Sequence, residues 1–200
     1  MKHFLLLLLV PFFSFTSNQI SSDDYDAQIN AVVTDFKANI FDQSICDAAA
    51  KKAEGISEAI EDAMNEDGVS KSERKKLEDL KKEAEALNSY INAISDLEGG
   101  FVTVEKMNLA NSRVHGDISA EQKGDFCTDI ISISIGDFIC YLAENNSSKI
   151  ISVNYRWKGP DGTKSGTGTV KVFANSVHPM YNNRKDKDVK KVTFMGLTCK

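Results

Sequence analysis

The sequence predicts an α+β fold in which an N-terminal antiparallel helical hairpin packs on a C-terminal antiparallel sheet of four or five strands. Through the first half of the chain, apolar residues recur at spacings of three and four, as on one face of a helix. In the second half they alternate with polar residues, as on one face of a strand. We expect residues 21–100 to form the helical hairpin region and residues 101–200 the antiparallel β region. Because 200 residues suit one domain, we expect residues 21–200 to form one folded unit.

The first twenty residues have the layout of a secretory signal peptide. A short basic head, Met1-Lys2-His3, precedes an unbroken apolar run from Phe4 to Val10, and small or polar residues follow from Ser14 to Ser22. The apolar stretch is about ten to twelve residues long, whereas a helix needs roughly twenty to cross a bilayer. We therefore expect residues 1–20 to be removed and the mature protein, without a transmembrane segment, to be secreted or periplasmic.

Two amphipathic segments open the helical hairpin region. Residues 23–41 have an apolar stripe, and residues 45–63 have an apolar face made mostly of alanine, which lets a neighbouring helix approach closely. The polar turn at 65–68 ends the second segment. Ser70 followed by Glu73 then predicts a capping box at the start of a third helix.

The third helical segment carries a heptad seam between residues 77 and 97. Its apolar residues alternate at spacings of three and four: Leu77, Leu80, Ala84, Leu87, Ile91 and Ile94, with Leu97 near the end. Three heptads are marginal alone in water, so another surface must cover them. We expect the seam to pack either on the protein's own sheet or on a partner helix, and the second alternative leaves a homo-oligomer open.

The β region contains several alternating segments separated by turns. The predicted strands are 101–104, 127–135, 138–142, 151–158, 167–174 and 189–197. Residues 108–124 have no firm period and are expected to be a polar connection, and residues 175–188 are expected to be a loop. These strands predict an antiparallel meander with one face covered by helices.

Four cysteines follow the leader, and in an oxidising compartment an even number predicts two disulfides, here among Cys46, Cys127, Cys140 and Cys199. No C-x-x-C spacing occurs and only His115 and His178 remain after export, so we predict no metal site. We expect Cys46 to join a helix to the sheet and Cys199 to hold the last strand.

One disulfide pairing is excluded by strand geometry. A two-residue turn at Gly136-Asp137 would place Cys140 opposite Ile133, six positions from Cys127. The two cysteines would then stand about 20 Å apart along the strands, far beyond the ~7 Å Cα separation that a disulfide tolerates. We therefore predict that Cys127 and Cys140 are not joined.

The charges are distributed unevenly along the chain. Residues 20–100 hold 19 acidic and 9 basic side chains, whereas residues 149–200 hold 3 acidic and 11 basic ones. The candidate binding residues lie in this basic part, where they could bind an anionic surface: Arg156, Lys158, Lys164 and Lys171. Strand alternation puts Tyr155 and Trp157 toward the core and the charges toward water, so a mixed aromatic and basic platform for nucleic acid is not expected.

Catalytic motifs are weak in this sequence. An extracytoplasmic hydrolase using His115 or His178 with a nearby carboxylate is one alternative, although no spacing supports it. No cofactor motif is present. The leading hypothesis is an exported, non-enzymatic binding or interaction protein of the cell envelope or extracellular space, whose partner is a protein or an anionic surface. A self-associating structural subunit that uses the 77–97 seam is the second alternative.

Overall fold

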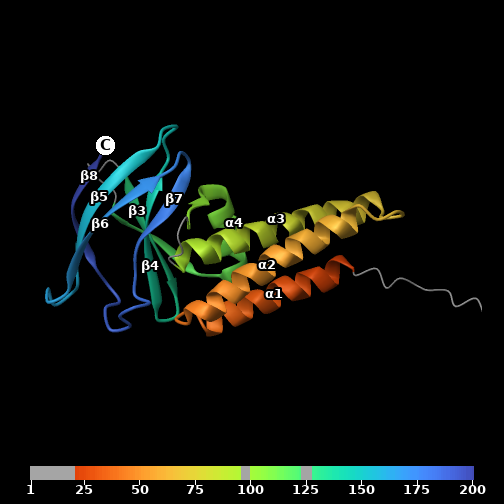
Figure 1. Ribbon diagram of the computed structural model, residues 1–200, viewed down its shortest axis with the longest axis horizontal. Helices are drawn as coiled ribbons and strands as arrows, with labels where there is room; N and C mark the ends of the chain where they lie inside the picture. The colour runs from red at the N-terminus through yellow and green to blue at the C-terminus, as the bar shows by residue number, and fades with distance from the viewer. Residues whose placement is uncertain (1–20, 96–99, 123–127) are drawn as a thin grey trace, which may run out of the picture.

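The structure is a computed structural model that describes residues 21–95, 100–122 and 128–200 (Figure 1). The predicted signal peptide, Leu97 and Cys127 lie outside the described residues. Helices pack on one side of a five-stranded antiparallel sheet, and a three-stranded antiparallel sheet covers the other side. The predicted α+β class is confirmed, but with two sheets in place of one meander.

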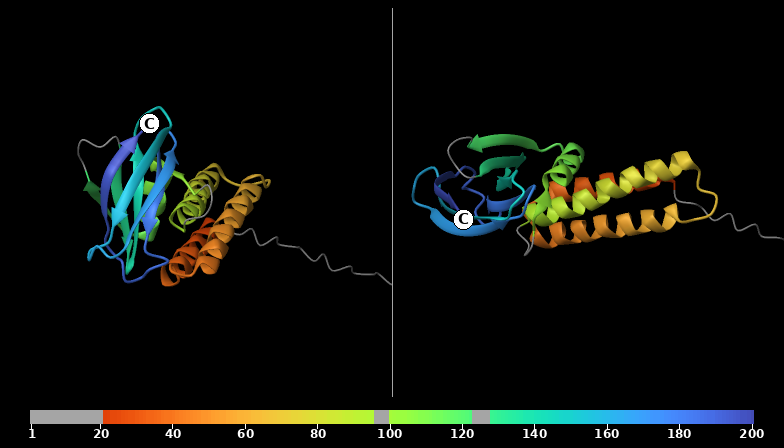
Figure 2. Two further views of the ribbon diagram at one scale, coloured as in Figure 1. Left: turned by 60° about the vertical axis from the view of Figure 1, so that its left-hand side comes forward. Right: turned by 90° about the horizontal axis from the view of Figure 1, so that it is seen from above.

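Four helices form the first layer: α1 (Ser22–Ala38), α2 (Gln43–Met64), α3 (Lys71–Ile94) and α4 (Val104–Val114). The first three match the predicted amphipathic segments, and α2 and α3 make the antiparallel hairpin, whose closed end projects beyond the sheets (Figure 2). Among the described residues, none of these helices is both long enough and apolar enough to cross a bilayer.

The heptad seam is used inside the monomer. Leu77, Leu87 and Ile91 are at most 2% exposed, and they belong to the core shared by the helices and the five-stranded sheet. Helix α3 packs against α2, α1 and α4. The seam is therefore covered within the chain, mainly by the neighbouring helices and only to a small extent by the sheet that was predicted to cover it.

The five-stranded sheet has the order β1-β7-β4-β3-β2, and the three-stranded sheet has the order β6-β5-β8. The first contains β1 (Val102–Thr103), β2 (Asp117–Gln122), β3 (Asp129–Ile135), β4 (Phe138–Asn145) and β7 (Ser176–Asn182). The second contains β5 (Ile151–Lys158), β6 (Ser165–Val172) and β8 (Thr193–Cys199).

Strand β4 lies at the centre of the molecule and is buried on both faces. Phe138, Cys140 and Leu142 face the helices, whereas Ile139 and Tyr141 face the three-stranded sheet. A strand with two buried faces is apolar at every position instead of alternating. This is why residues 138–142 form a continuous apolar run.

Three elements were not predicted. Helix α4 overlaps the segment that we expected to be a polar connection. Its apolar pattern is weak, because the helix is short and buries only Met107, Ala110 and Val114. Strand β2 is an edge strand that leaves even Ile118 39% exposed. Strand β7 lies in the segment that we expected to be a loop. Its sequence does not predict a strand because it contains Pro179, and proline is disfavoured within strands. In the structure, Pro179 lies where the β4–β7 register shifts.

The prediction of two disulfides is wrong. Cys46 and Cys140 form no disulfide, and both are completely buried. Cys140 pairs with Ile133 in the β3–β4 ladder, and this is the register from which we predicted that Cys127 and Cys140 are not joined. Counting cysteines cannot distinguish a bridged cysteine from one that serves as a small core residue, which is a common role for this side chain.

Cys46 connects the helices to the β region through a non-covalent contact. The guanidinium Nη1 of Arg184 lies 3.5 Å from Cys46 Sγ, and the same guanidinium carbon stands 5.7 Å from the centre of the Phe138 ring. Burial raises the pKa of the Cys46 thiol, although the Arg184 charge opposes this effect. The guanidinium of Arg184 therefore holds the segment after β7 against the Cys46 thiol of α2 and the Phe138 ring of β4.

Candidate functional site

Three of the four predicted binding residues lie on the outer surface of the three-stranded sheet, which faces away from the helices. We call this surface the basic face; on β5 and β6 it consists of Ser152, Asn154, Arg156, Lys158, Ser165, Thr167, Thr169 and Lys171. The alternate residues Val153, Tyr155 and Trp157 pack inward against the five-stranded sheet. The predicted orientation of Tyr155 and Trp157 toward the core, and of Arg156 and Lys158 toward water, is therefore confirmed.

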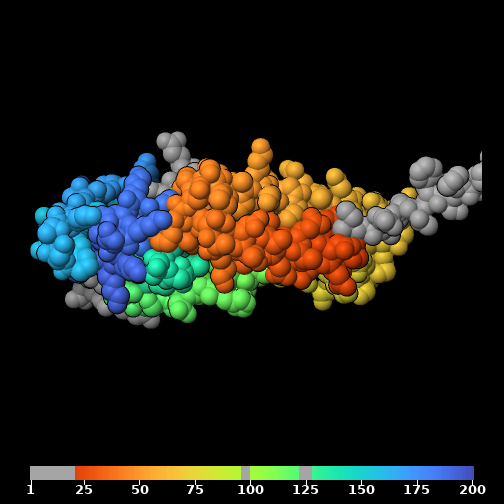
Figure 3. All heavy atoms as spheres, turned by 90° about the horizontal axis from the view of Figure 1, so that it is seen from below, coloured from red at the N-terminus to blue at the C-terminus, as the bar shows by residue number. Residues whose placement is uncertain are grey.

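The charges of this face have one sign. The three strands contain no aspartate or glutamate, whereas they contain Arg156, Lys158 and Lys171, all of which are exposed. In the register, Arg156 lies between Thr167 on one side and Met195 on the other. The C-terminal part of the chain gathers at one end of the molecule and the helices occupy the other (Figure 3).

Lys164 is separated from this face. It belongs to the turn between β5 and β6, and its ammonium pairs with the carboxylate of Asp186. That hydrogen bond raises the pKa of Lys164. The structure thus brings together three of the four predicted residues and gives the fourth an intramolecular partner.

A shallow hollow of about 350 Å³ lies around Arg156 on the basic face. Its polar lining includes Asn154, Thr167 and Thr169, and it contains no carboxylate. The Thr169 hydroxyl donates a 2.7 Å hydrogen bond to the side-chain oxygen of Asn154. A guanidinium beside hydroxyl and amide donors is the arrangement that binds sulfate, phosphate or carboxylate groups.

Gly196 shapes this hollow from the neighbouring strand. Its φ is +62°, in the left-handed region, and a Cβ there would stand 3.4 Å from Nη2 of Arg156. A side chain at this position would be strained by the positive φ and would stand in van der Waals contact with the guanidinium. Sequence analysis missed this residue because its relation to Arg156 depends on the bulged pairing of β5 with β8.

The two histidines of the hydrolase alternative lie apart from this hollow. His115 ends α4 in the left-handed conformation, with φ 56°, and its side chain is exposed. His178 lies on β7, and its Nδ1 is 2.9 Å from the carbonyl oxygen of Pro179. Neither lines the hollow on the basic face or the larger pocket described next. In the part of the chain that the structure describes, no three His, Cys, Asp or Glu side chains are grouped as a metal site requires.

The larger pocket, of about 560 Å³, lies at the far end of the helical layer. Glu73, from its lining, accepts a 2.9 Å hydrogen bond from the backbone N–H of Ser22, and this bond lowers the pKa of Glu73. Only half of the predicted capping box therefore forms, because Ser70 caps α3 while Glu73 turns to α1. The Tyr25 hydroxyl donates to Ala59 O. These polar groups join helices, so the pocket is explained by helix packing.

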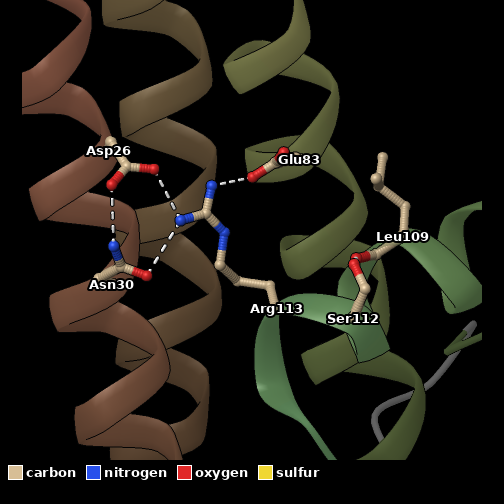
Figure 4. Close-up of polar contacts among 6 residues, drawn as sticks. All are labelled: Asp26, Asn30, Glu83, Leu109, Ser112 and Arg113. Atoms are coloured by element: carbon tan, nitrogen blue, oxygen red, sulfur yellow. Dashed lines mark hydrogen bonds and ion pairs between the residues drawn. The ribbon is translucent and has the colours of Figure 1, made fainter.

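Arg113 of α4 lies at the centre of a partly buried cluster of ion pairs (Figure 4). Its Nη1 donates to Asp26 at 2.7 Å and to Asn30 at 3.0 Å, and its Nη2 pairs with Glu83. Burial acts to lower the pKa of Arg113, but the hydrogen bonds to Glu83 and Asp26 outweigh it, and the pKa is raised. The cluster links α4 to α1 and α3, so we assign it a structural role.

Comparisons with protein-family models, with curated proteins and with solved structures gave no match. The site is therefore argued from its own geometry.

Proposed function

We propose that this chain is an exported binding protein, without catalytic machinery of its own, whose basic face holds an anionic ligand. The observation that carries the proposal is the single sign of charge on that face, where three exposed basic side chains stand among hydroxyl groups with no carboxylate in the strands. A face that only served solubility would gain more from mixed charges.

Export supports this proposal at the level of sequence. The leader precedes the N-cap of α1 at Ser21, so cleavage before that residue would leave the capping box of Ser21 and Asp24 intact. Because Cys46 and Cys140 form no disulfide, Cys127 and Cys199 are the remaining pair, and we propose that they form one disulfide. N-terminal sequencing of the secreted protein is expected to begin between residues 17 and 21.

Binding to dextran sulfate, a soluble polyanion, tests the ligand class. Titration at low ionic strength should show binding that weakens as salt is added, because exposed charges are screened. The variant Arg156→Glu, Lys158→Glu, Lys171→Glu should bind more weakly by at least roughly tenfold.

A matched control keeps the net charge equal. Lys51→Glu, Lys71→Glu, Lys75→Glu reverses three exposed lysines of α2 and α3, and it should reduce binding much less. Equal loss in the two variants would show that only net charge matters and would overturn the proposed site. No binding by the wild-type protein would overturn the ligand class.

A further inference from the structure

The basic face ends in a small exposed apolar cluster. Ile150, Phe101 and Phe173 expose 58%, 42% and 41% of their surface, respectively. The centres of the two phenylalanine rings are 4.6 Å apart and their planes are tilted by 34°, so the two exposed aromatic side chains contact each other. Single exposed apolar residues are common, but a contiguous group of large ones usually marks an interaction site.

The strand register makes this cluster continuous with the basic face. Ile151 pairs with Val172 as the last pair of β5 and β6, and Ile150 and Phe173 lie directly beyond this pair in the chain. Alternation carried one residue past the ends of the two strands would place Phe173 on the side of Lys171 and Ile150 on the side of Ser152. The same end holds the C-terminus, marked in Figure 1, because the backbone of Lys200 pairs with that of Ser152.

This juxtaposition places apolar anchors and positive charges on one surface. The exposed Lys149 directly precedes Ile150 in the chain, and the exposed Lys171 lies two residues before Phe173. A soluble polyanion would use the charges but would leave the apolar cluster in water. An anionic bilayer offers both partners, because its negative headgroups overlie an apolar interior.

We propose that the basic face docks on a bilayer containing anionic lipids, with Phe101, Ile150 and Phe173 entering the headgroup boundary. The inference rests on the proposed function and specifies its ligand as a lipid surface. Stable peripheral binding needs two signals, and this face supplies both an apolar and an electrostatic one. Each basic residue near an anionic leaflet contributes about a fivefold gain in partitioning.

Co-sedimentation with vesicles tests the inference. The purified protein should bind vesicles of phosphatidylcholine and phosphatidylglycerol and should bind pure phosphatidylcholine much less. Phe101→Ser, Ile150→Ser, Phe173→Ser should reduce vesicle binding by at least roughly tenfold while leaving dextran sulfate binding unchanged. The basic-face charge reversal should weaken both.

Ile118→Ser is the matched control, because Ile118 is a 39% exposed apolar residue on β2 of the other sheet. It should leave vesicle binding unchanged. Ile150→Ser alone removes the most exposed member of the cluster and keeps the test valid if the triple variant fails to fold.

Three outcomes would overturn the inference. Binding to dextran sulfate but not to anionic vesicles would refute the lipid surface and leave the proposed function standing. Absence of both would refute the two together. A protein that sediments as a dimer, and becomes a monomer in the apolar triple variant with vesicle binding unchanged, would show that a second copy covers the cluster.

Discussion

Tyr155 lies over Gly168, its cross-strand partner on β6, and its hydroxyl reaches past that pairing to donate a 2.6 Å hydrogen bond to Met180 O on β7. One side chain thereby joins the two sheets. A Cβ on residue 168 would stand 2.5 Å from Cζ of the Tyr155 ring, so the contact depends on glycine. Trp157 is related to Gly166 in the same way two pairs further along the strands. The apolar layer behind the basic face is built on these two glycines.

Gly168→Ala should destabilise the protein by about 2 kcal/mol, because overpacking forces the tyrosine away and weakens its hydrogen bond. The measurement is the free energy of unfolding in urea. Gly55→Ala is the control: nothing lies within 4 Å of a Cβ at this position in α2, and alanine there should stabilise by about 0.5–1 kcal/mol. Equal stability of the Gly168 variant and the wild type would contradict the close packing.

Arg113→Met should cost about 2 kcal/mol of unfolding free energy, because it leaves Glu83 and Asp26 without their shared cation. The value lies below that of a fully buried pair because Asp26 is 46% exposed. Arg113→Lys should recover only part of the loss, since one ammonium cannot reproduce the fork of contacts.

The exposed pair of Lys52 and Asp35 provides the comparison for Arg113. Their side chains are 62% and 55% exposed, and Lys52→Met should change the unfolding free energy by no more than about 0.5 kcal/mol. If the two methionine variants were equally stable, the Arg113 cluster would not be a structural tie.

The sequence could predict the helices and the orientation of the basic face, but it could not predict the Arg113 cluster or the hollow beside Arg156. Local periodicity was enough for α1 to α3, and alternation was enough to orient Arg156 and Trp157. The partners of Arg113 could not be predicted, because Asp26 is 87 residues away and α4 itself has a weak apolar pattern. The hollow beside Arg156 likewise depends on the bulged segment of β8 that contains Gly196, which no local pattern reveals.

Alkaline pH should reveal the environment of Tyr181. Burial raises its pKa to about 12, and its hydroxyl donates a 2.9 Å hydrogen bond to Val189 O. An unfolded tyrosine ionises near pH 10. The neutral phenol is therefore favoured in the folded state, and its contribution to stability is full below pH 10 and lost as the pH rises toward about 12.

Urea unfolding of the wild type and Tyr181→Phe across this pH range measures the effect. The stability difference between the two proteins should be constant below pH 10 and should shift against the wild type above it. Other tyrosines with raised pKa values that do not contact Tyr181, such as Tyr25, act equally in both proteins and cancel. Parallel curves throughout would mean that Tyr181 ionises as it does in the unfolded chain.

Alkylation of the cysteines tests the interior and the proposed disulfide together. Cys46 and Cys140 are 0% exposed, and burial raises the pKa of Cys46, so neither should react with iodoacetamide in the native protein. In denaturant without reductant, both should be alkylated, because neither is in a disulfide. Peptide mapping of the secreted protein should then recover Cys127 linked to Cys199. Alkylation of all four cysteines without reductant would contradict the proposed disulfide and weaken the argument for export. A disulfide-linked peptide containing Cys46 would contradict the burial of Cys46 as a thiol beside Arg184.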